Sequence, residues 1–354
     1  MQTTDLKPRT SPWPHRWAVA LACATFPLLW VGGLVTTTDA GMAVPDWPTT
    51  YGYNLFLYPW TTWLSGPWDM FVEHGHRLLG ATVGMITIGL LTVLWRSEAR
   101  AWVRWLGVAA LALVIFQGVL GGMRVRLDER SLAMLHGCTG PLFFAVTVAI
   151  VVFTSRRWFS GATGSASALR DLNSIHWQSQ WHPRDSGHIR RLAIVTCILV
   201  YLQILLGAVL RHVPIAAEPG TFALAVRFHL FLAAVLTLHI AVLVWLVRRH
   251  VRDIQPLRGL ASTLSTLLVV QLTLGAATWV VRFAAPTWAP AWISTARGAI
   301  QDGGWLQTHV VTAHVAVGSL LLATSLAIAL FSQRLLPAST ATYKSTARPQ
   351  EAAV

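Results

Sequence analysis

The sequence predicts an all-α integral membrane protein with eight transmembrane helices, arranged as two pseudo-symmetric four-helix bundles with both termini in the cytoplasm. Its 354 residues are 54% hydrophobic and only 12% charged, and the mean hydropathy is +0.54, whereas a soluble domain is about 25% charged. Long apolar runs alternate with short charged segments, and two short motifs recur along those runs. The chain has room for many membrane spans and little soluble domain, so we expect its function to lie within the membrane.

Eight apolar runs are long enough to cross a bilayer, which takes roughly 20 residues per helix. Because backbone polar groups must pair within the segment in lipid, each run is predicted to be a helix. The predicted spans cover residues 17–36, 75–95, 104–123, 132–153, 190–210, 224–247, 260–282 and 309–331. The first run is too long for a signal peptide, and the polar start of the chain holds Asp5, which argues against a mitochondrial transit peptide. We therefore expect a multi-pass protein of the bacterial cytoplasmic membrane.

The positive-inside rule gives the orientation. Nineteen of the 27 Lys and Arg residues lie in the two terminal segments and in the loops after the second, fourth and sixth spans, and eight lie on the other side. This distribution places both termini in the cytoplasm. It also accounts for the net charge of +13, so nucleic acid is excluded as a partner and membrane lipid is the expected surroundings.

The chain is expected to divide into two halves. Residues 1–153 form the N-terminal half, and residues 190–331 form the C-terminal half. Between them, the Ser-, Gly- and Arg-rich segment 154–189 is predicted to be a cytoplasmic linker, and 332–354 a cytoplasmic tail. The first outer loop, 37–74, lacks Lys and Arg but is rich in aromatic and acidic residues, which indicates a cap at the membrane interface.

A glycine motif marks the outer ends of the odd-numbered runs. It reads Gln117 to Gly121-Gly122, Gln203 to Gly207-Ala208 and Gln271 to Gly275-Ala276, and the first run keeps its end as Gly32-Gly33. Small residues let helix backbones approach closely, and a buried Gln can hydrogen-bond between helices. Simple helix packing and contact with a cofactor both remain open for these glycines.

A second motif marks the even-numbered runs, where a histidine is followed four residues later by glycine or alanine. The four pairs are His76/Gly80, His136/Gly140, His229/Ala233 and His314/Gly318. All four histidines fall within roughly two turns of the outer end of their helix, so they are expected at similar depth. The small residue lies on the same face one turn deeper, where a flat macrocycle would need room.

Two histidines in each half predict two bis-histidine sites, His76 with His136 and His229 with His314. Haem iron suits paired imidazoles in an apolar helical bundle. Zinc would require three or four ligands that converge on one point, and the three cysteines lie singly without CxxC spacing. The alternative is that the four histidines are structural and hydrogen-bond across helices.

The remaining histidines are weaker candidates. His74 points about 160° away from His76 around the helix, so both cannot bind one iron. We interpret His74 and His309 as rim residues and His239 as a packed core residue. His212 borders an outer loop, and the others fall in cytoplasmic segments: His15, His176, His182, His188 and His250.

Glu73 lies three residues before His76, on nearly the same helix face, where a partly desolvated carboxylate can accept a proton or stabilise a developing cation. Its alternative role is an N-terminal helix charge favoured by the macrodipole. Val226 stands three residues before His229, so only the first half has the acid. Arginines near the histidines are candidates for binding haem propionates or for snorkelling to headgroups: Arg77, Arg124, Arg126, Arg211 and Arg227.

Taken in order, these residues resemble the haem A synthase family over about residues 28–331. The matching pieces are Gly32-Gly33, Asp39-Ala40-Gly41-Met42 with Asp46-Trp47, Glu73-x-x-His76-Arg77, Gln117-x-x-Leu120-Gly121-Gly122, His136, His229 and His314. No single piece is diagnostic, but their order and spacing over eight helices are.

The resemblance implies an oxidoreductase that converts the C8 methyl of haem O to a formyl group, which gives haem A for cytochrome oxidase. It implies haem b as cofactor on His229 and His314, haem O as substrate facing His76 and His136, and Glu73 as the acidic residue of the oxidation. Haem O synthase and cytochrome oxidase assembly factors are the implied partners, and a homo-oligomer is left open. Some family members carry a cysteine pair in the first outer loop, and this loop has none.

Three other classes of membrane protein fit the sequence less well. A non-catalytic di-haem b electron-transfer protein would explain four histidines but not an acid in one half only. A repeat-built transporter would require broken helices and a charged site at mid-depth. A haem O synthase would require clustered aspartates for magnesium-bound diphosphate, and no DxxD or DxxxD occurs.

Overall fold

The computed structural model describes residues 11–159, 183–213, 218–282, 290 and 303–336. Within these ranges, eight helices are long and apolar enough to cross a membrane, which confirms the predicted number of spans. They are α1 (Trp13–Thr37), α3 (Trp68–Ser97), α4 (Ala101–Leu127), α5 (Arg130–Thr154), α7 (Pro183–His212), α8 (Pro219–His250), α9 (Gln255–Arg282) and α11 (Trp305–Leu335). Most of the predicted linker (residues 160–182) and of the predicted tail (337–354) falls outside the described residues, as do His176 and His182.

Most helices are longer than the apolar runs because hydrogen bonding continues into their polar flanks. α3 gains a first turn with Asp69 and a last turn with Arg96, charges of the signs that the helix macrodipole favours at those ends. Proline precedes α3 at Pro67 and opens α8 at Pro219, positions where the missing N–H has no partner to lose.

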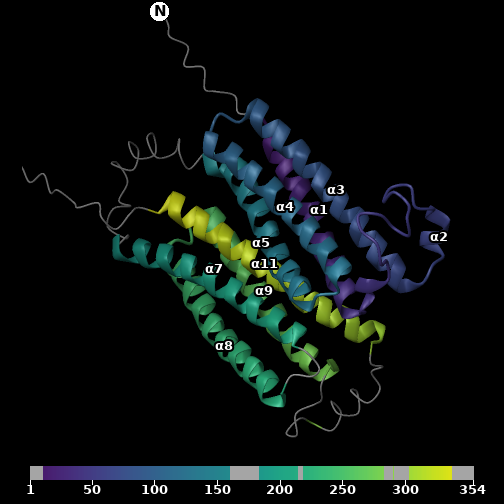
Figure 1. Ribbon diagram of the computed structural model, residues 1–354. Coiled ribbons are helices and arrows are strands. Elements are labelled where there is room, and N and C mark those ends of the chain that lie inside the picture. The colour runs from purple at the N-terminus through teal and green to yellow at the C-terminus, as the bar shows by residue number, and fades with distance from the viewer. Residues whose placement is uncertain (1–10, 160–182, 214–217, 283–289, 291–302, 337–354) are drawn as a thin grey trace, which may run out of the picture.

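α11 lies at the centre of the molecule (Figure 1). It contacts α9 and α7 of the last four spans and also α1 and α5 of the first four. α1, α3, α4 and α5 lie together on one side of it, and α7, α8 and α9 on the other. The two halves therefore join through α1, α5, α7 and α11, while pseudo-symmetry between them and the cytoplasmic location of the termini remain predictions.

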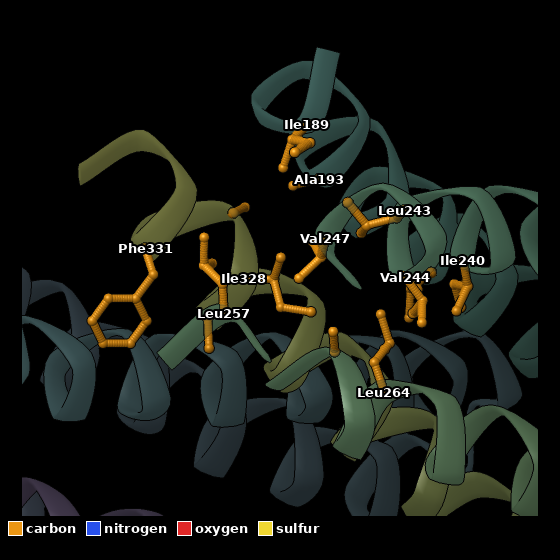
Figure 2. Close-up of a cluster of buried hydrophobic side chains, with 14 of the residues drawn as sticks. Ile189, Ala193, Ile240, Leu243, Val244, Val247, Leu257, Leu264, Ile328 and Phe331 are labelled. Atoms are coloured by element: carbon orange, nitrogen blue, oxygen red, sulfur yellow. The ribbon is translucent and has the colours of Figure 1, made fainter. Parts of the chain in front are cut away.

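Each half has its own apolar core, and both cores lie toward the same end. The core of the second half draws on the start of α7, the end of α8, the start of α9 and the end of α11, together with two residues of α5, Ala145 and Val152. Ile189, Leu243, Leu257 and Ile328 are fully buried in it (Figure 2). The core of the first half likewise draws on the start of α1 and α4 and the end of α3 and α5. Large apolar side chains on the outer helix faces, such as Phe231 and Val269, are exposed, as a lipid-facing surface requires.

The segment between α1 and α3, residues 38–67, folds back over the start of α3. It contains the short helices η1 (Ala40–Met42) and α2 (Trp60–Leu64) and a cis Trp47–Pro48 bond. Val44 and Thr50 of this outer segment are fully buried. Its exposed side chains are largely aromatic or apolar, among them Tyr51, Tyr53, Phe56, Leu57, Trp60 and Leu64. The segment thus covers the helix end that carries Glu73 and His76.

Candidate functional site

His76 of α3 and His136 of α5 face each other at the end of the first half that is opposite its apolar core. Their ring centroids are 6.2 Å apart and the rings are nearly perpendicular, at 89°. Two imidazoles that bind one metal ion from opposite sides, with metal–nitrogen distances of about 2 Å, place their centroids roughly 6 Å apart. The separation therefore fits a single metal ion held between the two rings.

Each of the four motif histidines packs against a glycine of the preceding odd-numbered span. A Cβ atom added to Gly32, Gly121, Gly207 or Gly275 would lie 2.9, 3.2, 3.4 or 3.1 Å from the Cε1 atom of a histidine, in the order His76, His136, His229 and His314. A larger residue at Gly32, Gly121 or Gly275 would push the imidazole away, whereas at Gly207 the first added carbon would only touch the ring. The glycine motif and the histidine motif are thus two sides of one contact that occurs four times.

The ring nitrogens of these four histidines are largely uncommitted. Among the described residues, Nδ1 of His76, His229 and His314 is buried without a hydrogen-bond partner, and Nδ1 of His136 lies 3.1 Å from the carbonyl oxygen of Gln117. A buried polar atom left unpaired costs about 1–3 kcal/mol. In the described part of the chain, the amide of Gln117, turned as its partners require, lies 3.0 Å from Nδ1 of His136. The structural alternative does not explain the unpaired Nδ1 atoms of the other three rings, which suit a metal-bound group.

The other described histidines differ in this respect. Nδ1 of His212, His239 and His309 lies 2.9–3.2 Å from the carbonyl oxygen four residues earlier in its own helix, and His15 pairs with Thr154 at 3.2 Å. No cluster of three or more His, Cys, Asp or Glu that could hold a metal ion occurs in the ranges described. The arrangement agrees with paired ligands and not with a zinc centre.

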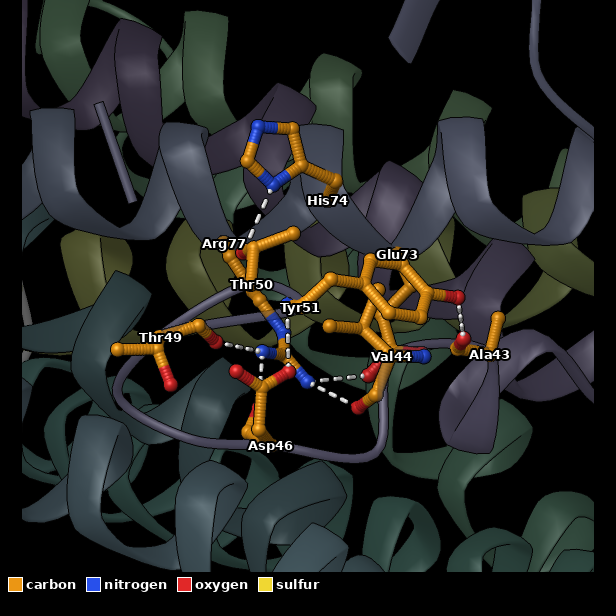
Figure 3. A network of polar contacts seen from close by, with 9 residues as sticks. All are labelled: Ala43, Val44, Asp46, Thr49, Thr50, Tyr51, Glu73, His74 and Arg77. Atoms are coloured by element: carbon orange, nitrogen blue, oxygen red, sulfur yellow. Dashed lines mark hydrogen bonds and ion pairs between the residues drawn. The ribbon is translucent and has the colours of Figure 1, made fainter. Parts of the chain in front are cut away.

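The carboxylate of Glu73 is buried and bound at both oxygens (Figure 3). Oε1 accepts a hydrogen bond from Nη2 of Arg77 at 2.9 Å, and Oε2 accepts one from the backbone N–H of Val44 at 2.9 Å. One donor belongs to α3 and the other to the outer segment. Glu73 therefore links the helix that carries His76 to the segment that covers it.

Arg77 is committed to the same contact. Its Nη1 donates to the carbonyl oxygens of Asp46 and Thr49 at 2.6 and 3.0 Å, and its Nη2 donates to that of Val44 at 2.7 Å. The guanidinium thus holds the turn of the outer segment from below (Figure 3). Of the arginines expected to bind propionates, Arg77 has its terminal nitrogens occupied by protein partners.

The expectation that His74 is a rim residue is wrong. Its side chain is only 1% exposed, Nδ1 lies 3.1 Å from Oγ1 of Thr50, and its ring contacts Tyr58 and Trp63. The physical reason is that the outer segment folds over the face of α3 opposite His76, which turns an exposed helix start into a buried one. The ring of His309 is stacked on that of Trp305, with 4.4 Å between the ring centroids.

Asp46 closes the turn of the outer segment. Its carboxylate accepts hydrogen bonds from the backbone N–H groups of Tyr51 at 2.7 Å and Gly52 at 2.9 Å. Burial alone would raise the pKa of Asp46, but bonds from Gly52, Thr49 and Tyr51 favour the charged form and hold the pKa below its usual value. The turn is therefore stabilised by an ionised Asp46.

The other arginines lie at three kinds of position. The Arg124 guanidinium lies against Gly41 of the outer segment, where it fills the place of a Cβ atom, and Arg126 donates to the carbonyl oxygen of Trp47 at 3.3 Å. Arg211 donates to the carbonyl oxygen of Gly33 at 2.9 Å and to the hydroxyl of Thr37, so it ties α7 to α1. Arg227 is exposed on α8.

Comparisons with known proteins place this geometry in context. A family model, COX15-CtaA, described as cytochrome oxidase assembly protein, matches residues 67–291. The chain is 30% identical over 184 residues to heme A synthase of Shouchella clausii, which covers 51% of this chain and 53% of the relative. It is 26% identical over 234 residues to heme A synthase of Allorhizobium ampelinum, which covers 59% of each. A protoheme IX farnesyltransferase of Halobacterium salinarum is 27% identical over 187 residues, 52% of this chain and 36% of that protein. The matched part of the chain thus covers about half of the Shouchella protein and about a third of the Halobacterium protein.

Proposed function

The chain belongs to the family of cytochrome oxidase assembly proteins, and from that membership we propose that it is a haem A synthase of the bacterial cytoplasmic membrane. The proposed reaction oxidises the C8 methyl group of haem O to a formyl group. The observation that carries the proposal is the first histidine pair, 6.2 Å apart, with a buried carboxylate on the same helix one turn before His76. Relatives named heme A synthase support it.

In this proposal the two histidine pairs have different tasks. His76 and His136 face the iron of the substrate, haem O. His229 and His314 hold a resident haem b, a group that supplies one-electron redox chemistry when bound. The glycines behind the four rings and the uncommitted ring nitrogens fit such ligation. Haem O synthase is the proposed supplier of substrate, and cytochrome oxidase assembly factors are the proposed recipients of product.

Glu73 is the proposed catalytic residue. Each of two hydroxylations of the methyl carbon would take an oxygen from water, release two protons and pass two electrons onward, with haem b as the proposed first acceptor, and the resulting diol would lose water to give the formyl group. A base or an anion close to the methyl carbon lowers the barrier. The Arg77 guanidinium and the Val44 N–H fix the position of the carboxylate. Movement of the outer segment would release Oε2, since Val44 belongs to it. Arg124, Arg211 and Arg227 remain the arginines proposed for the propionates, whereas Arg77 acts through the outer segment.

Two alternative functions are less well supported. A di-haem electron-transfer protein would have no use for the single buried carboxylate of the first half. Prenyl transfer, the activity named for the Halobacterium relative, needs clustered aspartates that hold magnesium-bound diphosphate, and the sequence lacks a DxxD or DxxxD pattern. The matched residues cover only 36% of that protein.

Haem analysis of substituted proteins tests the proposal. The chain is produced together with a haem O synthase, and the extracted haems are identified by mass. We expect haem A from the unchanged protein, and haem B without haem A from Glu73→Gln, which keeps an acceptor for the Val44 N–H but loses the negative charge. Glu98→Gln is the matched control, because Glu98 pairs with Arg100 beyond the other end of α3. Haem B alone from the unchanged protein would favour the electron-transfer function, and haem A from Glu73→Gln would remove Glu73 from catalysis.

A further inference from the structure

A glutamine side chain binds the helix backbone at some of the motif histidines. Gln203 of α7 lies four residues before Gly207, the glycine behind His229, and its Nε2 donates to the carbonyl oxygen of His229 at 3.0 Å. The histidine is therefore fixed twice by α7, at its ring by the glycine and at its backbone by the amide. Rotation or sliding of α8 against α7 would break the second contact.

Gln117 repeats this arrangement, and Gln271 lies at the matching position of its helix. Gln117 lies four residues before Gly121, and its amide, in the orientation that its partners require, donates to the carbonyl oxygen of His136 at 3.2 Å and accepts from the N–H of Gly140 at 3.2 Å. Gln271 lies four residues before Gly275, and its Nε2 is 3.5 Å from the place of a Cβ on Gly318, one turn after His314. Gly318 thus leaves room for the amide of Gln271.

The first span is the exception. The residue four positions before Gly32, the glycine behind His76, is Leu28, an apolar side chain packed on the core of the first half. A Cβ on Gly80, one turn after His76, would meet no described atom within 4 Å. Leu28 also shows that a leucine fits this place in the fold. The amide oxygens of Gln203 and Gln271 are buried without a partner in the described ranges, a cost that is offset only if the amide does something that leucine does not.

We propose that these glutamines are positioning residues that grade how firmly the four histidines hold their ligand, and that Leu28 leaves His76 the least firmly held. The inference rests on the proposed function. Both histidines of the second pair then have an amide beside them, as suits a resident haem. The first pair combines His136, which has an amide beside it, with His76, which has none, as suits a substrate that must leave after its oxidation.

The loss of support is tested on purified protein loaded with haem. Gln203→Leu and Gln203→Asn, whose amide is too short to reach the carbonyl, are expected to transfer haem B to excess apomyoglobin about 10-fold faster than the unchanged protein, the lower range seen for outer-shell partners of metal ligands. The low-spin electron paramagnetic resonance signal of the bound haem should shift or broaden in both Gln203 variants. Thr196→Val is the matched control, a buried polar residue of the same helix. Size-exclusion chromatography shows which variants are folded, and the Asn variant preserves the test if the Leu variant is not.

The reverse substitution, Leu28→Gln, should slow the release of haem O or haem A, identified by mass, about 10-fold and leave haem B release unchanged. Unchanged release in both Gln203 variants, or in Leu28→Gln, overturns the inference and leaves the proposed function standing. An unchanged protein that binds no haem overturns the proposed function itself, so the two failures are distinguishable.

Discussion

At the scale of single residues, the site depends on the absence of a side chain behind each imidazole, where glycine stands. The rings of His76 and His136 occupy space that a Cβ atom on Gly32 or Gly121 would fill. Glycine is needed there for close approach and not for an unusual backbone angle, because all four glycines lie within regular helices. At Gly32, Gly121 and Gly275 even one added methyl group would therefore crowd the ring.

We expect Gly121→Ala to displace His136 and to weaken haem binding by the first half. The added methyl group would stand 3.2 Å from Cε1 of the ring, and overpacking of this kind costs about 1–3 kcal/mol. Gly118→Ala on the same helix is the control, because its Cβ would meet no described atom within 4 Å. The absorbance of haem O bound to each variant measures the difference, and equal binding by both would show that the ring has room to move.

At the scale of elements, the outer segment is attached to α3 by buried polar contacts and by aromatic ones, such as the stacking of Trp63 on Phe71. Glu73, Arg77 and His74 reach up from the first turns of α3 to the backbone and hydroxyl groups of residues 44–50. The turn above them is closed by Asp46. Such a segment can detach without disrupting the packing of the membrane helices.

Acid should loosen this turn. Because the pKa of Asp46 is lower in the folded protein than in a free chain, its contribution to stability is present above the usual carboxyl pKa and is lost as the pH falls through the lowered one. Hydrogen exchange at Tyr51 and Gly52 should therefore speed up at acidic pH, after correction for intrinsic exchange rates. Asp46→Asn should remove most of this pH dependence, and a profile that stays the same in that variant would assign it to another group.

The sequence allowed the prediction of the membrane helices and of the histidine repeat, since both rest on periodic patterns. The outer segment was less accessible. Arg77 binds three backbone carbonyl oxygens. Because every residue has a backbone carbonyl group, no pattern of side chains in the sequence could predict this contact. For His74, the helical period correctly separated its direction from that of His76, but what covers it depends on the path of a loop.

At the scale of the whole molecule, α1 connects the two halves close to their histidines. Gly32 supports His76, while its neighbour Gly33 packs on Thr312, two residues before His314. Arg211 binds the carbonyl oxygen of Gly33, and the hydroxyls of Thr37 and Thr312 are 3.2 Å apart. α1 thus carries contacts to both histidine pairs on adjacent residues.

Arg211→Leu should weaken the junction between the halves. It removes the hydrogen bonds from a charged group to α1, each worth about 1.5–3 kcal/mol, and we expect a lower thermal midpoint in detergent together with altered spectra of both bound haems. Arg248→Leu, exposed at the end of α8 away from the histidines, is the control and should leave the midpoint within experimental error. A change confined to one haem would mean that the halves respond independently.

The two larger apolar cores lie toward the end of the bundle away from the histidines, and the four ligand positions contribute neither to them nor to the small cluster of Leu34, Val35 and Val72. Membrane insertion and helix assembly can therefore be completed by the polypeptide alone, before any porphyrin reaches it. The order of biogenesis that this allows is an empty, already folded protein that is loaded afterwards at its histidine-bearing end. Cells short of haem would then accumulate a stable precursor instead of losing the chain to proteolysis.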